Sequence, residues 1–127
     1  MARQLFGTDG IRGVAGEYPL DIRTVFAFGR AVGEWAGQGT VLVGMDTRES
    51  APMLASVVRA GLVKAGVESE FAGVVPTPGV AWLTKTGPYK AGVMISASHN
   101  PYQDNGLKVF AHSGDRKSTR LNSSHLG

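Results

Sequence analysis

The sequence predicts a three-layer α/β/α sandwich, in which helices cover both faces of a mixed, mostly parallel sheet. The first observation is an alternation of short apolar runs with helix-length periodic segments, joined by short connections. The second is the composition, with 43% hydrophobic and 18% charged residues among 127, which suits one buried core. The third is that polar residues follow the apolar runs directly, where ligands bind in open α/β folds.

The first predicted elements lie between residues 6 and 45. Residues 6–13 contain three glycines and are expected to form an irregular loop that projects Arg12, or a glycine-rich turn whose arginine is only solvated. A helix should begin at the N-cap Asp21 and end before Gly37. Its glycines predict close packing against the sheet. Residues 40–45 form the first predicted strand. The expected inward face of the helix is Ile22, Val25, Phe26, Gly29, Val32, Gly33 and Ala36.

The rest of the chain repeats this alternation. A second helix is expected from Ser50 to a C-terminal cap at Gly66, with a proline in its first turn. A third, shorter helix should begin at Thr77 and include Leu83. The remaining strands are predicted at residues 67–75, 90–95 and 107–110.

Composition also excludes several classes of protein. The chain has no cysteine, which excludes disulfides and thiolate zinc sites. No apolar run approaches ~18 residues and the N-terminus has no signal-peptide pattern, so we expect a cytoplasmic protein. The net charge of +3 arises mainly in residues 114–127. We therefore expect neither a nucleic acid nor a membrane as a partner.

Polar residues gather at one predicted edge of the sheet. Asp46 and Arg48 follow the first strand of the parallel set, Pro76 follows the second and Ser98 the third. The carboxyl ends of parallel strands share an edge, so these residues should lie along it. Two interpretations stand for Asp46 and Arg48: a pair that faces a ligand, or a helix cap with a salt bridge.

Ser98 is the central candidate because it follows an apolar strand and precedes a turn-forming Asn-Pro pair. Ser96 and His99 flank it, and Lys108 is ten residues further along the chain. A hydroxyl among donors and a cation suits phosphoryl chemistry. A purely structural turn remains an alternative.

Two other chemistries fit the Ser98 segment poorly. A hydrolase nucleophile elbow needs small residues two positions before and after the serine, normally glycines, whereas Ser96 and Asn100 stand there. A metal site at His99, with Asp104 nearby, has too few ligands.

Four motifs, in this order and spacing, resemble the first domain of the α-D-phosphohexomutase superfamily. They are F-G-T-D-G-I-R-G at residues 6–13, D-T-R at 46–48, P-T-P at 76–78 and I-S-A-S-H-N-P at 95–101. The first and last are most similar to those of the bacterial phosphoglucosamine mutases. We expect a domain of this type over residues 1–113, truncated at its C-terminal end. Residues 114–127 should be a non-family tail, either disordered or a translated sequencing-adapter segment.

The resemblance implies a cytoplasmic isomerase of carbohydrate metabolism that supplies a peptidoglycan precursor. It would interconvert glucosamine 6-phosphate and glucosamine 1-phosphate through a phosphoserine at Ser98 and a hexosamine bisphosphate, which is the intermediate or activator. Mg²⁺ would bind through the phosphate on Ser98, with its other ligands absent from this chain. Lys108 would transfer protons, while Arg12 would stabilise charge because arginine stays protonated.

The resemblance also implies supporting residues and partners. His99 is placed with the catalytic residues and Asn100 with those that hold the substrate, together with Ser96. Asp46 and Arg48 would shape the phosphate-facing edge. The expected partners are a hexose or hexosamine monophosphate and the missing C-terminal domains of the same chain, without which the chain should be inactive. A phosphoglucomutase or phosphomannomutase domain and a stand-alone phosphosugar-binding module remain alternatives.

Overall fold

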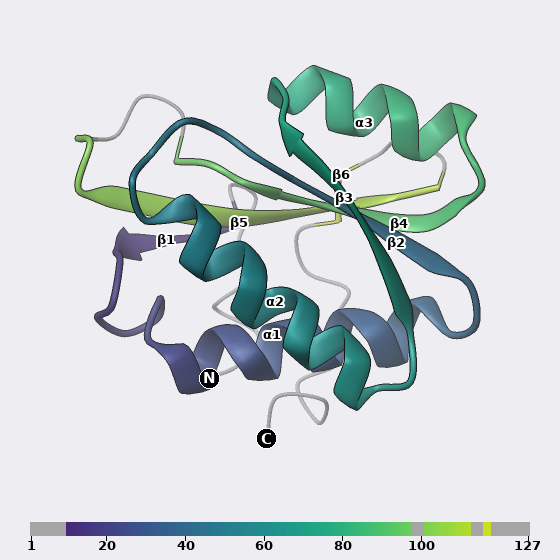
Figure 1. The fold of residues 1–127 in the computed structure, drawn as a ribbon, viewed down its shortest axis with the longest axis horizontal. Coiled ribbons are helices and arrows are strands. Elements are labelled where there is room, and N and C mark those ends of the chain that lie inside the picture. Colours follow the sequence, from purple (N-terminus) through teal and green to yellow (C-terminus); the bar gives the residue numbers. More distant parts are fainter. Residues whose placement is uncertain (1–9, 98–100, 113–115, 118–127) are drawn as a thin grey trace.

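The computed structural model describes residues 10–97, 101–112 and 116–117, the last pair as backbone only (Figure 1). Their strands form one six-stranded sheet with the order β1-β5-β4-β2-β3, and β6 pairs with β5. The elements are β1 (Ile11–Val14), α1 (Ile22–Ala36), β2 (Thr40–Met45), α2 (Ala51–Lys64), β3 (Glu68–Val74), α3 (Thr77–Thr86), β4 (Tyr89–Ile95), β5 (Asp104–Ala111) and β6 (Arg116–Lys117).

Helices cover both faces of the sheet, which confirms the predicted α/β/α class. In Figure 1, α1 and α2 lie together on one face and α3 lies on the other. The sheet is mixed: β3, β2 and β4 are parallel, whereas β5 is antiparallel to both β4 and β1. The parallel strands are the ones connected through α2 and α3, because the chain must return to the same end of the sheet before it can begin another parallel strand. In the part of the chain that the structure describes, no helix is long and apolar enough to cross a membrane.

The prediction of an irregular loop over residues 6–13 is wrong for residues 11–13, which belong to β1. This strand pairs antiparallel with β5, with Ile11 opposite Leu107 and Arg12 opposite Gly106. Ile11 enters the core and is 2% exposed. Four residues that include a glycine are too short for strand alternation to be recognised. Residues 6–9 lie outside the described part of the chain.

Helix α1 begins as predicted and buries part of the predicted face, namely Val25, Gly29, Val32 and Gly33. The carboxylate of Asp21 accepts a hydrogen bond from the backbone N–H of Thr24 at 3.2 Å, which confirms the N-cap. Ile22 was expected to face inward and is 64% exposed, whereas Phe28 is completely buried. The buried face also includes Phe28 and Ala31, because α1 packs against both the sheet and α2.

The glycines of α1 serve packing between helices, which corrects the expectation that they face the sheet. A Cβ atom on Gly29 would overlap the carbonyl of Val58 in α2, and one on Gly61 would overlap the carbonyl oxygen of Phe26 in α1. A Cβ on Gly33 would lie 2.7 Å from that of Ala65. The two backbones therefore approach each other directly.

The sheet has two apolar layers of unequal extent. The larger one, between the sheet and the α1–α2 pair, reaches across to Ile11 and Leu107. The smaller one, beneath α3, is centred on Leu42, Val80, Met94 and Phe110. Helix α3 does not extend over β1, the edge strand at the other end of the sheet (Figure 1).

Candidate functional site

The structure describes five of the eight residues predicted for the site: Arg12, Asp46, Arg48, Ser96 and Lys108. Ser98, His99 and Asn100 lie outside the described residues, so their predicted roles stay predictions.

Arg12 and Lys108 share the sheet face on which α3 lies. Lys108 pairs with Met94, which belongs to the apolar cluster beneath α3, and only 4% of Lys108 is exposed. Arg12 lies opposite Gly106, two residues before Lys108 on β5. Alternate residues of a strand point to the same face, so the two cationic side chains share it.

Ser96 extends this arrangement to the end of β4. Its backbone N–H donates to the carbonyl oxygen of Gly106 at 2.9 Å, and 5% of the residue is exposed. Ser96, Gly106 and Arg12 therefore form a row across three neighbouring segments, with Lys108 one step further along β5. The structure brings the three predicted residues together.

Two glycines, not predicted as site residues, shape the floor beneath these side chains. Gly10 has φ +78°, and a Cβ there would overlap the carbonyl oxygen of Leu107 and lie 3.3 Å from Cγ of Lys108. A Cβ on Gly106 would lie 2.8 Å from the carbonyl oxygens of Ile11 and Ser96 and 3.3 Å from Cγ of Arg12. The Arg12 stem thus crosses Gly106. The Asn-Gly pair at 105–106 is the signal that could have drawn attention to it.

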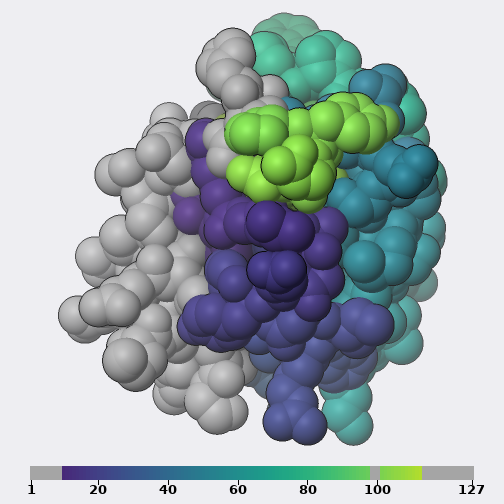
Figure 2. Space-filling model, turned by 90° about the vertical axis from the view of Figure 1, so that its left-hand side faces the viewer, coloured from purple at the N-terminus to yellow at the C-terminus, as the bar shows by residue number. Residues whose placement is uncertain are grey.

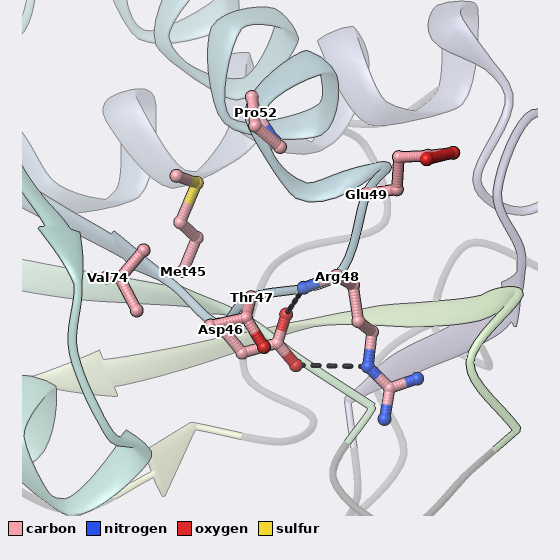
Figure 3. A pocket seen from close by; sticks show the side chains of 7 residues that line it. All are labelled: Met45, Asp46, Thr47, Arg48, Glu49, Pro52 and Val74. Carbon is pink, nitrogen blue, oxygen red and sulfur yellow. Dashed lines mark hydrogen bonds and ion pairs between the residues drawn. The ribbon is translucent and has the colours of Figure 1, made fainter.

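Asp46 and Arg48 form the salt bridge that one interpretation of the sequence predicted (Figure 3). The Asp46 carboxylate accepts hydrogen bonds from the backbone N–H and from Nε of Arg48, both at 3.0 Å. Nη1 of Arg48 donates to the carbonyl oxygens of Pro101 at 2.9 Å and Asp104 at 2.8 Å. The Arg48 side chain is 8% exposed. Its contact with a phosphate-facing edge stays a prediction.

Further hydrogen bonds join the connection between β2 and α2 to residues 101–105. The hydroxyl of Tyr102 donates to the carbonyl oxygen of Thr47 at 3.0 Å, and Nδ2 of the fully buried Asn105 donates to Oγ of Ser50 at 2.9 Å. Figure 2 shows the green atoms that follow residue 100 lying against the purple region of β1 and the blue β2–α2 connection. The Ser50 side chain makes no capping bond to α2, and its hydroxyl oxygen accepts the bond from Asn105.

A cavity of about 320 Å³ lies at the carboxyl ends of β2 and β3, where sequence patterning predicted a ligand edge (Figure 3). Polar groups of the β2–α2 connection and apolar side chains both line it. Its lining residues are Met45, Asp46, Thr47, Arg48, Glu49, Pro52 and Val74.

The described side chains do not fit a magnesium site. Among residues 10–97 and 101–112, no three His, Cys, Asp or Glu side chains are grouped so that they could hold a metal ion. The carboxylate of Asp46 is engaged by Arg48. Two cations and a hydroxyl instead have the chemistry of a site for an anionic group.

Arg12, Ser96 and Lys108 thus share one sheet face of an α/β/α domain. The family model of phosphoglucomutase/phosphomannomutase, alpha/beta/alpha domain I, matches residues 3–121. The chain belongs to this family, which confirms the resemblance carried by its four motifs.

Curated relatives and a solved structure agree with this assignment. The chain is 61% identical over 118 residues to a phosphoglucosamine mutase of Solibacter usitatus, covering 90% of this chain and 26% of the relative. It is 56% identical over 116 residues to that of Koribacter versatilis, covering 88% and 25%. A phosphoglucomutase/phosphomannomutase family protein from Burkholderia thailandensis superposes with a TM-score of 0.79 at 28% identity, covering 97% of this chain and 28% of that structure. The chain spans about a quarter of its relatives' length.

Proposed function

We propose that this chain is the N-terminal catalytic domain of a phosphosugar mutase that interconverts glucosamine 6-phosphate and glucosamine 1-phosphate. The observation that carries the proposal is the convergence of Arg12, Ser96 and Lys108 on one face, beside the point where β4 leads towards Ser98. The names of the relatives from Solibacter usitatus and Koribacter versatilis support glucosamine as the sugar.

In this proposal Ser98 carries a phosphoryl group between two positions of the sugar. The bond from phosphorus to Oγ of Ser98 breaks while a bond to a sugar hydroxyl oxygen forms, and Lys108, in its neutral form, takes the hydroxyl proton and passes it to the released Oγ. After the bisphosphate reorients, its other phosphoryl group moves to Oγ of Ser98, and the serine proton passes through Lys108 to the sugar oxygen that is released. Arg12 stays protonated and stabilises negative charge on the phosphoryl oxygens. His99 and Asn100 would help to hold the loop and the substrate.

Mg²⁺, the remaining domains and a cytoplasmic location belong to the proposal too. The metal would bind through the phosphate on Ser98, and its carboxylate ligands would come from outside the described residues, which do not supply them. Such domains would also bring the sugar-recognition groups, so this chain alone should be inactive as a mutase.

A phosphoglucomutase or phosphomannomutase domain is the second candidate. The family description and the Burkholderia thailandensis structure favour it, because both carry these names. The two candidates share the chemistry at Ser98 and differ in the sugar.

A chimaeric enzyme tests the chemistry that the two candidates share. Residues 1–112 of this chain would replace the matching N-terminal part of the Solibacter usitatus relative, and conversion of glucosamine phosphate would be measured. We expect the chimaera to be active, and Ser98→Ala to lower kcat more than about 10³-fold, the scale for removing a covalent nucleophile. Full activity of the alanine variant would overturn the mechanism.

A further inference from the structure

We propose that Arg48 is a positioning residue that anchors the chain on the C-terminal side of Ser98 and fixes the entry into the strand carrying Lys108. Its catalytic meaning rests on the proposed function. The anchoring itself rests on contacts between described residues.

The guanidinium group of Arg48 joins two segments far apart in the sequence. Nε binds the Asp46 carboxylate at the end of β2, while Nη1 binds the carbonyl oxygens of Pro101 and Asp104 before and at the start of β5. The backbone N–H of Asp104 also donates to the carbonyl oxygen of Pro101 at 2.9 Å, which closes this turn. A single buried side chain therefore holds both ends of the turn.

The other flank of Ser98 is anchored by backbone hydrogen bonds. The backbone N–H of Ser96 is bonded to the carbonyl oxygen of Gly106, and that of Asp46 to the carbonyl oxygen of Ile95. The chain that contains Ser98 thus leaves from one fixed point and returns to a second one, at Pro101. Arg48 sets the second point relative to the first.

The guanidinium shape suits this role and a lysine does not. Nε and Nη1 are donors of one rigid, planar fork, so the carboxylate and the two carbonyls are held in a defined relative position. An ammonium group is a single, flexible point charge. Without the fork, the carboxylate and the two carbonyls lose a charged hydrogen-bond partner. We therefore expect Arg48→Lys to loosen the turn even though it keeps the charge.

Amide hydrogen exchange in the 127-residue chain tests the anchor. Arg48→Met and Arg48→Lys should accelerate exchange of the Asp104 amide about tenfold or more, because local opening controls exchange. Arg59→Met is the matched control: Arg59 is a half-buried arginine on α2 whose Nε bonds Oγ of Ser69 and whose guanidinium lies over the ring of Phe71. It should leave Asp104 unchanged. Equal exchange rates at Asp104 in the unaltered chain and in Arg48→Lys would overturn the proposal that Arg48 anchors the turn. If Arg48→Met does not fold, the comparison with Arg48→Lys still decides it.

Kinetics in the chimaeric enzyme test whether Arg48 positions the catalytic groups. Arg48→Lys should lower kcat by about 10-fold or more with a smaller change in KM, since misplacement of reacting groups affects mainly the transition state. Added ethylguanidinium should partly restore kcat in Arg48→Ala and not in Ser98→Ala. An unchanged kcat in Arg48→Lys would overturn the positioning role. An inactive chimaera without further substitution would count against the proposed function, while the exchange experiment would still decide the anchor.

Discussion

Lys108 is a buried lysine on β5, and it lies on the sheet face that also carries Arg12. In the chimaeric enzyme we expect Lys108→Gln to lower kcat by about 10²- to 10⁴-fold, the usual contribution of general acid–base catalysis. Glutamine keeps a polar side chain but cannot take up the proton of the sugar hydroxyl. Lys90→Gln is the control, because Lys90 is exposed and lines a different cavity with Pro88 and His112. Equal kcat values for the two variants would remove Lys108 from the mechanism.

Gly106 has no room for a side chain. We expect Gly106→Ala to lower the free energy of unfolding by about 1–3 kcal/mol, the usual cost of overpacking, because the new Cβ would press on the carbonyl oxygens of Ile11 and Ser96. Gly79→Ala in α3 is the control, since its Cβ would meet neighbours at ordinary distances of 3.5 Å or more. Urea unfolding of both variants measures the difference. Similar stabilities would show that the row from Ser96 to Arg12 tolerates a Cβ.

At the scale of an element, the first turn of α1 depends on Asp21. Hydrogen bonds from Thr24 hold the pKa of the Asp21 carboxyl below its usual value of 3.8. A carboxyl whose folded-state pKa is lowered stabilises the fold above its unfolded pKa, and this contribution disappears as the pH falls below 3.8 through the folded value. Asp21→Asn should keep the cap but lose this pH dependence, whereas Asp21→Ala should cost about 1 kcal/mol at neutral pH.

Thermal unfolding of these variants between neutral pH and pH 3 provides the measurement. The unaltered chain and Asp21→Asn should converge in stability as the pH falls. Parallel curves for the two proteins would mean that the Asp21 carboxyl does not contribute in this way.

Element boundaries follow local signals where such signals exist. The Asp21 cap and the periodicity of α1 were sufficient to place that helix, and the predicted strands at 40–45 and 90–95 match β2 and nearly match β4. Strand β5 begins at Asp104, earlier than the predicted Leu107. The apolar pattern did not reveal its first three residues because they are polar residues and a glycine. Strand β1 has no periodic pattern in its sequence, and it forms through its antiparallel pairing with β5. Residues 116–117, within the predicted tail, likewise form β6 against β5.

At the scale of the whole molecule, exposed apolar side chains predict self-association. Trp82 on α3 is 63% exposed, and Val74 at the end of β3 is 57% exposed. Large apolar side chains that are left exposed in this way favour contact with another protein surface. We expect the chain to associate in a concentration-dependent way in sedimentation experiments, and Trp82→Lys to weaken the association. A monomer at all concentrations would contradict this prediction.

The sequence by itself determined the α/β/α class, the order of its helices and most strands, and the motifs that mark the family. Those features depend on local propensity and on periodicities of a few residues, which a single chain displays directly. Tertiary structure alone decided that Arg12 crosses Gly106, that the glycines of α1 face α2, and that Arg48 binds the carbonyls of Pro101 and Asp104. These depend on strand register, on the approach of two helices and on the direction of a long side chain. Each of them joins residues distant in sequence, so no local pattern could specify it.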